Sequence, residues 1–427
     1  MNSRFIKDLP ELLENKVISQ DVADSIQSYY KSKNEGKPNR LFLIFGVLGS
    51  ALVGLGIILI LAHNWDDFSR TTKTIWAFLP LVIGQLFTGF SILRNKSKTW
   101  KEASGVFLFF SVGASMTLIS QIYNIPGNLS SFLLTWILLC APLIYLLKSR
   151  AVAILHVVFA TYYVFEYGYS VGSHTPWYYL LCLALIAPFY IQLLRQQERS
   201  NITSIFNWLI PLSITISLGA FVRPGDGDYG FFMYIILFGI FYNLGKMPYF
   251  QDQKLRRNGY LIIGSLGTMI TLLITTFKWF WEEMAKSAVA DTQTIMISST
   301  LFIIALAILV YSYSKKWVKG FNLFQFVFII FSLLFVIGMV DVTLSTILTN
   351  VFVLALGLTT MKIGVDQFHF GILNYGLLIV TALVVCRFFD TNITFVIRGL
   401  LFVIVGAGFF LTNYIMLKKQ KSKISNK

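Results

Sequence analysis

The chain alternates between long apolar segments and short polar stretches. Residues 1–40 are polar, and the first apolar run begins near Leu41. A run of about 20 apolar residues is long enough for a helix to cross a bilayer, and the pattern predicts about fourteen such spans. Their predicted bounds are 41–62, 74–93, 103–122, 129–147, 151–167, 177–194, 203–222, 230–245, 258–277, 294–314, 320–340, 343–360, 370–386 and 392–416. The fifth, eighth and thirteenth are short, so tilted spans, re-entrant pieces and a smaller count of twelve remain open.

The polar residues 1–40 predict a helical hairpin in the cytoplasm. Its first helix runs from Pro10 through Glu14, and its second from Gln20 to about Lys33. A DNA-binding helix-turn-helix is disfavoured, since the second helix is not notably basic. We expect the domains to be the hairpin (1–40), the transmembrane bundle (41–417) and a basic cytoplasmic tail (418–427). Residues 10–33 are expected to contact a membrane or cytoplasmic protein partner, and no nucleic acid.

The composition excludes a soluble protein. Hydrophobic residues make up 56% of the chain, charged residues 13%, and the mean hydropathy is +0.69. Soluble chains carry about 25% charged residues, so this chain lacks the polar side chains to cover a water-facing surface. The predicted fold class is an all-α polytopic transmembrane helix bundle, with membrane lipids as its surroundings.

The distribution of basic residues predicts the orientation. The formal net charge is +15, and Lys and Arg gather in cytoplasmic loops of membrane proteins. With the N-terminus inside, 28 of the 35 basic residues fall on the inner side. Fourteen spans then place both termini in the cytoplasm, although dropping two spans near Lys362 would preserve that result.

The acidic residues have the complementary distribution. Ten of them fall on predicted outer loops or outer helix ends: Asp66, Asp67, Glu166, Asp226, Asp228, Glu282, Glu283, Asp291, Asp341 and Asp390. Two interpretations remain open. The acids either keep short loops soluble, or they form an outward vestibule that attracts cations.

No motif assigns a cofactor, a metal site or a catalytic residue. The chain has no P-loop and no H-E-x-x-H zinc motif. Its cysteines, Cys140, Cys182 and Cys386, lie in or beside apolar segments without C-x-x-C spacing. ATP-driven transport and kinase chemistry are therefore disfavoured, and an enzyme is the less favoured class.

Two outer helix ends carry unusual polar groups. The first span ends in His63, Asn64, Trp65 and Asp66, which form either an interfacial anchor or part of an outward polar site. The third ends in Ser120-Gln121-Ile122-Tyr123-Asn124. Ser120, Gln121 and Asn124 share a face, and with Gln85 of the second span they are expected to form hydrogen bonds between helices, while Tyr123 is a further candidate site residue. Inside the fifth span, His156 is either a packed core histidine or a proton relay.

Arginines mark the end of the bundle. Arg398 falls inside the last predicted span, where a charge is costly unless it is paired or hydrated. Asp390, Glu166 and Arg387 are predicted on the same side. The alternatives are a structural ion pair, an anion or headgroup site built on Arg387 and Arg398, and extension of Arg398 to the interface.

These motifs carry a family resemblance. The order is a short helical hairpin, a Gly-rich span ending in Ala62-His63-Asn64-Trp65-Asp66, and a span ending in Leu118-Ile119-Ser120-Gln121-Ile122-Tyr123-Asn124-Ile125. It resembles the bacterial membrane protein family called domain of unknown function 2157, over about residues 10–150. Phe68-Ser69 stands where many members have a Pro. The resemblance implies a bacterial cytoplasmic (inner) membrane protein and no particular activity.

Three functions are compatible with these patterns. The first is transport or binding of an envelope-related or lipid-linked small molecule in a hydrated cavity lined by Arg398, Gln85 and Gln121. The second is a scaffold or sensor in an envelope complex. The third is a membrane-embedded envelope enzyme using Glu166, Asp66 or His63.

Overall fold

We describe the fold from a computed structural model of the full chain. It describes residues 9, 11–15, 17–34, 65–170, 174–251, 254–286, 290–317 and 322–390, with short pieces at 396, 399–400, 403, 406–408, 410 and 414. The chain divides into two compact units, Met1–Trp76 and Ala77–Lys427. Each unit is described by itself below.

The described part of the first unit is helical, as the sequence predicts. Residues 11–14 form a helical turn, and α2 covers Gln20–Asn34. After the undescribed residues, Trp65 to Phe68 form a turn before α4, and the ammonium of Lys73 lies 5.8 Å from the centre of the Trp65 ring. That contact suits an aromatic side chain at a membrane interface.

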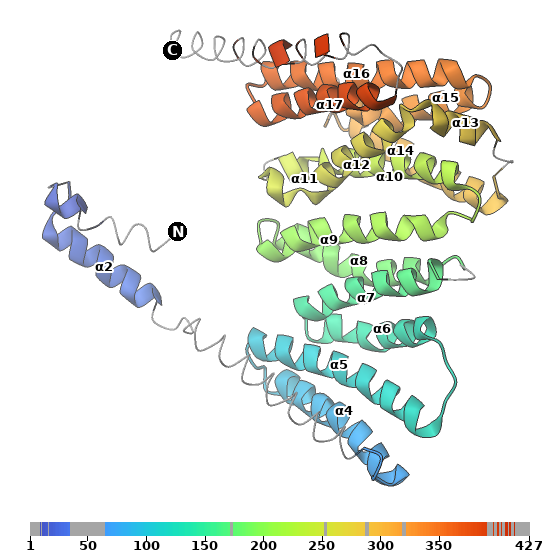
Figure 1. Ribbon diagram of the computed structural model, residues 1–427. Coiled ribbons are helices and arrows are strands. Elements are labelled where there is room, and N and C mark those ends of the chain that lie inside the picture. The colour runs from blue at the N-terminus through green and yellow to red at the C-terminus, as the bar shows by residue number, and fades with distance from the viewer. Residues whose placement is uncertain are drawn as a thin grey trace. The chain divides into compact units, whose positions relative to one another are not determined.

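The described part of the second unit is built of helices, coloured from blue through red in Figure 1. The α-helices are α4 (Arg70–Leu93, which begins in the first unit), α5 (Lys98–Tyr123), α6 (Leu129–Leu146), α7 (Arg150–Gly168), α8 (Tyr178–Gln196), α9 (Asn201–Leu218), α10 (Gly227–Gly245), α11 (Pro248–Gln251), α12 (Gly259–Thr275), α13 (Lys278–Lys286), α14 (Thr292–Ser314), α15 (Val327–Gly338), α16 (Val342–Asp366) and α17 (Phe370–Asp390). The 3-10 helices are η1 (Gly219–Phe221), η2 (Leu255–Arg257) and η3 (Leu323–Phe326).

Each predicted span from the second to the thirteenth coincides with a helix. By length and composition, 10 helices of the described part can cross a membrane, or 11 if the bent pair α12 and α13 counts as one span. The eleventh predicted span is the shorter apolar pair η3 and α15. The first predicted span lies outside the described residues, and only short pieces of the last are described, so the count of fourteen and the orientation remain predictions.

Helix α10 occupies the centre of the second unit. It packs against α9, α12, α14 and α15. Two glycines bring α10 and α12 into backbone contact: a Cβ on Gly264 would lie 2.6 Å from the Tyr242 backbone nitrogen, and one on Gly245 would lie 2.6 Å from that of Leu261. Small residues permit such approach between membrane helices.

Buried polar side chains pair between helices instead of facing lipid. Asn243 of α10 donates to the Gln325 carbonyl oxygen at 3.1 Å, and Tyr190 of α8 donates to Asn207 of α9 at 2.7 Å. His156 is buried in α7, with its Nε2 2.9 Å from the Cys182 carbonyl oxygen. That contact favours the packed core histidine over the proton relay, and it shows how polar groups are satisfied in the bundle.

Candidate functional site

The break between α12 and α13 is the sharpest irregularity among the candidate spans. The two helices meet at an angle of 78°. Lys278, Glu282 and Glu283 make α13 amphipathic, so it cannot extend the apolar span. Trp281 turns back and donates from Nε1 to the Thr275 carbonyl oxygen at 2.7 Å, which gives a partner to one carbonyl freed by the break.

Arg387 of α17 lies at this break. Its Nη2 donates to the Thr276 hydroxyl at 3.1 Å, and its guanidinium carbon lies 4.7 Å from the centre of the Phe277 ring. From α16, Asn350 donates to the Thr276 carbonyl oxygen at 2.9 Å. Three helices thus bring an arginine, an amide and a broken backbone together. Broken helices with nearby charges form many substrate sites in transporters.

A cavity of about 400 Å³ opens at the other end of the same helices. Residues of α10, α12, η3, α16 and α17 line it, and apolar side chains dominate its wall. Lys246, Asn322 and His369 bring polar groups to the end that the basic residues predict as cytoplasmic. A mostly apolar wall with a few polar groups is typical of a small-molecule site.

Lys246 supplies a cation to this cavity. Its ammonium lies 5.6 Å from the centre of the Tyr242 ring, and burial lowers the pKa of Lys246 below its ordinary value. The Tyr242 hydroxyl accepts a hydrogen bond from Asn322 at 2.7 Å. Tyr375 of α17 spans the cavity wall and donates to the Ser265 carbonyl oxygen of α12 at 3.0 Å.

The cavity and the break share α12, α16 and α17. On α17, Tyr375 lines the cavity and Arg387 reaches the break. These residues are separated by about 18 Å along the helix axis at 1.5 Å per residue. Polar groups therefore stand at both ends of one three-helix region.

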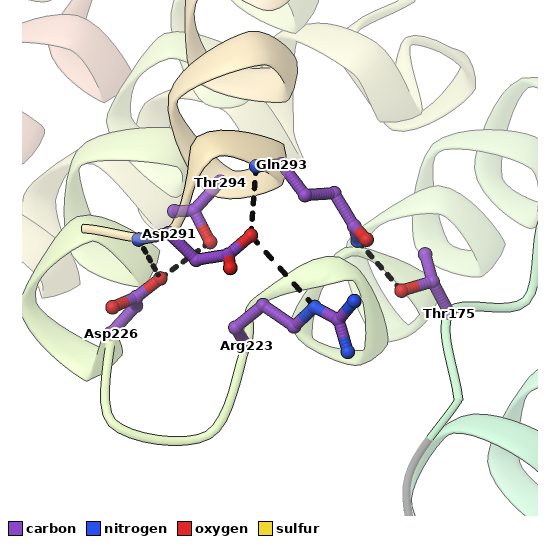
Figure 2. A network of polar contacts seen from close by, with 6 residues as sticks. All are labelled: Thr175, Arg223, Asp226, Asp291, Gln293 and Thr294. Atoms are coloured by element: carbon purple, nitrogen blue, oxygen red, sulfur yellow. Dashed lines mark hydrogen bonds and ion pairs between the residues drawn. The ribbon is translucent and has the colours of Figure 1, made fainter.

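A second polar network ties together loops on the predicted outer side (Figure 2). Asp226 accepts hydrogen bonds from the Asp291 backbone nitrogen at 3.1 Å and from the Thr294 hydroxyl at 2.6 Å. Gln293 donates to the Thr175 hydroxyl at 2.6 Å. The ion pair between Arg223 and Asp291 is long, 4.0 Å, and exposed, so it contributes little. This network joins the loop before α10 and the residues before α8 to the start of α14.

Several acidic side chains that could form the predicted outward vestibule have hydrogen-bond or ion-pair partners within the protein. Asp341 caps α16 by accepting from the Leu344 nitrogen at 2.9 Å. Glu282 pairs with Lys278, and Glu283 with Lys286. Because these acids serve caps, loops and local pairs, the structure favours the solubility interpretation over a cation-attracting vestibule.

The other sequence-predicted residues are dispersed. Gln85 lines an otherwise mostly apolar cavity of about 440 Å³ between α4, α5 and α6, and Gln121 is exposed and not among its lining residues. The structure therefore does not bring the two glutamines together at this cavity. Ser120 donates to the Ile125 carbonyl oxygen, and Asn124 ends α5 with a positive φ of 50°. Their polar groups complete a helix end.

The remaining candidates are placed as follows. Tyr123 is exposed, and Glu166 is partly buried near the end of α7 without a hydrogen-bond or ion-pair partner among the described residues. Trp65 and Asp66 lie in the turn before α4. His63, Asn64 and Arg398 lie outside the described residues, as does the side chain of Asp390. The predicted cluster of Arg387 with Arg398 and Asp390 thus stays a prediction.

Sequence reasoning missed most of the residues that surround the cavity and the break. Lys246 was counted only as a loop charge. Asn350 interrupts an apolar span, and Asn322 with Gln325 precedes another, so each was a visible exception to its surroundings. Polar residues inside such spans commonly face the bundle interior, and this signal would have found them.

The part of the chain that the structure describes holds no group of three or more His, Cys, Asp or Glu side chains placed to bind a metal. Comparison with curated proteins and with solved structures gave no match. Residues 10–153 match the family Predicted membrane protein (DUF2157). This stretch contains the sequence features that suggested the family: the predicted hairpin, the Ala-His-Asn-Trp-Asp motif and the end of α5.

Proposed function

We propose that the protein binds an amphipathic anion in the membrane and carries it between the two leaflets along α12, α16 and α17. The observation behind this proposal is that these helices line a cavity with Lys246 at one end and hold Arg387 at a broken helix, about 18 Å along α17 from the cavity residue Tyr375. A mostly apolar cavity wall suits an acyl or prenyl chain, and the two cations suit a phosphate or carboxylate.

Each end would serve one part of the passage. The ammonium of Lys246 would receive the anionic head from the cytoplasmic leaflet, while the apolar wall takes the chain. The bond from Tyr375 to the Ser265 carbonyl oxygen closes the wall between α12 and α17. Opening it would let the head move toward Arg387, where the guanidinium and the Thr276 hydroxyl would donate hydrogen bonds to it in place of water.

The test is movement of a fluorescent phosphatidylglycerol, labelled on its acyl chain, in vesicles containing the purified full chain. Dithionite bleaches only outward-facing label, so the inner pool disappears only if the lipid moves. Losing one close charge contact costs about 1.4 kcal/mol, or tenfold. Lys246→Gln and Arg387→Gln should therefore slow movement about tenfold, whereas Lys315→Gln, an exposed lysine at another predicted inner loop, should not.

Two results would contradict the proposal. One is equally fast movement of a labelled phosphatidylcholine, which has no net negative charge. The other is an unchanged rate in both Lys246→Gln and Arg387→Gln, with the variants folded and inserted at wild-type levels. Arg387→Lys separates charge from geometry, because a lysine keeps the charge and loses the planar donors.

A scaffold remains the second candidate, supported by α2. Val22 and Tyr29 lie on its predicted apolar face and are 46% and 58% exposed. An amphipathic helix with an uncovered apolar stripe can dock a partner helix. Photo-crosslinking from positions 22 and 29 in cells should capture a protein, and capture of lipids alone would count against this function.

A further inference from the structure

A group of positive charges surrounds a second cavity on the predicted cytoplasmic side, among α5, α6, α7 and α8. This cavity has a volume of about 410 Å³ and lies where α5 begins, α6 meets α7, and α8 ends. Five cationic side chains line it: Lys96, Lys98, Lys101, Lys148 and Arg150. None of its lining residues belongs to the cavity of the proposed function.

The carboxylate of Glu102 acts on Lys98 but offsets only one of the five positive charges. Among the described residues, none of the five cations forms an ion pair. Three hydrogen bonds hold this carboxylate at the start of α7. It accepts hydrogen bonds from the Ser149 hydroxyl at 2.5 Å and from the backbone nitrogens of Arg150 and Ala151 at 3.0 and 2.9 Å.

Local contacts hold parts of the group in place. Arg150 donates from its guanidinium to the Gln197 side chain, and Lys96 lies 4.9 Å from the centre of the Phe90 ring. Lys148 occupies the turn between α6 and α7 with a φ of 49°. Since these like charges repel one another, an anion in the cavity would stabilise the arrangement that the fold imposes.

The rest of the wall combines apolar side chains with Tyr145 and three glutamines, Gln192, Gln196 and Gln197. Ile144, Leu147, Phe189 and Leu193 line the same cavity. Lys98 and Arg150 begin α5 and α7, and α8 ends at Gln196, so three helix ends define one membrane interface here. The positive-inside tendency explains lysines in a cytoplasmic loop, but it does not explain why they converge on a cavity with a partly apolar wall.

We infer that this cavity binds the headgroup of an anionic phospholipid, with the phosphate among the lysines and the start of the acyl chains against the apolar part of the wall. Basic pockets between membrane helices on the cytoplasmic side bind such headgroups. A phosphomonoester with about two negative charges suits the site best, because the five cations and Glu102 leave a surplus of positive charge.

The test measures binding of dioctanoyl phosphatidic acid to the purified full chain in detergent. The variant Lys98→Gln/Lys101→Gln/Lys148→Gln should raise the Kd about tenfold or more, because it removes three of the five charges. The matched control Lys254→Gln/Lys315→Gln/Lys316→Gln removes as many charges from exposed lysines of other predicted inner loops and should change the Kd less than about twofold. The triple variant leaves Lys246 in place, so a raised Kd is assigned to this cavity and not to the cavity of the proposed function.

Three outcomes would overturn the inference. They are an equal loss of binding in both triple variants, binding of dioctanoyl phosphatidylcholine as tight as that of phosphatidic acid, and displacement of the lipid by inorganic phosphate at equal concentration. The last would assign the cavity to a free anion. If the triple variant fails to fold, photoactivatable phosphatidic acid can be crosslinked to the wild-type chain. Crosslinked peptides should come from residues 96–101, 144–150 and 189–197, and labelling only elsewhere would refute the site.

Discussion

Glu102 caps a helix to which it does not belong, and its removal gives a sharp test of the structure. The carboxylate on α5 accepts from two backbone nitrogens in the first turn of α7 and from the Ser149 hydroxyl. A hydrogen bond to a charged group contributes about 1.5–3 kcal/mol. Because Glu102 is only partly buried, we take the lower figure for each backbone bond, so Glu102→Ala should cost about 3 kcal/mol.

Glu102→Gln keeps one acceptor oxygen and loses the charge at the helix N-terminus. It should cost about 2 kcal/mol, since one bond of about 1.5 kcal/mol is lost together with an interaction with the helix dipole of about 0.3–1 kcal/mol. Reversible unfolding by SDS in mixed micelles, followed by tryptophan fluorescence, measures both values. Asp67→Ala, at an exposed acid in a turn, is the control.

Glu102→Ala should also strengthen anion binding at the basic cavity lined by Lys98 and Arg150, because it removes a negative charge beside them. Stability and affinity should therefore change in opposite directions in Glu102→Ala. A variant as stable as the Asp67→Ala control would refute the capping role. Weaker binding of phosphatidic acid in a folded Glu102→Ala protein would refute the electrostatic reasoning.

Three further predictions concern packing, the helix break and orientation. Gly264→Val should abolish the folded bundle or greatly reduce its yield, because even a Cβ would lie 2.6 Å from the Tyr242 nitrogen. The control Gly89→Val should express normally, because a Cβ there meets nothing within 4 Å. Equal yields of the two variants in detergent extracts would contradict the backbone contact. Asn350→Ala should cost about 1–2 kcal/mol in SDS unfolding, since Asn350 bonds the Thr276 carbonyl at the break, and an unchanged midpoint would argue against that contact. In a variant lacking all three cysteines, Lys286→Cys lies on a predicted outer loop and should react with an impermeant maleimide in intact cells. Lys316→Cys lies on a predicted inner loop and should react only after lysis. The reverse labelling would show that the predicted orientation is inverted.

The sequence predicted the helices because membrane spans carry a strong local signal. Apolar length alone placed α6 within one residue of its bounds, since no charge interrupts the chain between Glu102 and Lys148. It placed the start of α5 five residues late, because Lys98, Lys101 and Glu102 belong to that helix. The signal weakened where spans were not simple. The run 258–277 looked like an ordinary span, and only the following Lys278–Lys286 helix, at 78° to it, shows that the span is broken.

The sites were harder to predict because they depend on tertiary contacts. The sequence indicated Arg387 as an unusual charge, but its partners Thr276 and Phe277 lie more than a hundred residues away. Gln85 and Gln121 share polarity but not position. The basic cavity combines the start of α5, the turn before α7 and the end of α8, and no spacing along the chain reveals that these ends meet.

The central position of α10 also imposes an order on biosynthesis. Asn243 finds its partner in Gln325, 82 residues later. At about 5–20 residues per second, ribosomes need on the order of 4–16 s to produce that partner. During that interval a half-built bundle must hold an amide in the bilayer or beside the insertion machinery. We therefore expect α10 to leave the translocon late, together with the helices that eventually enclose it.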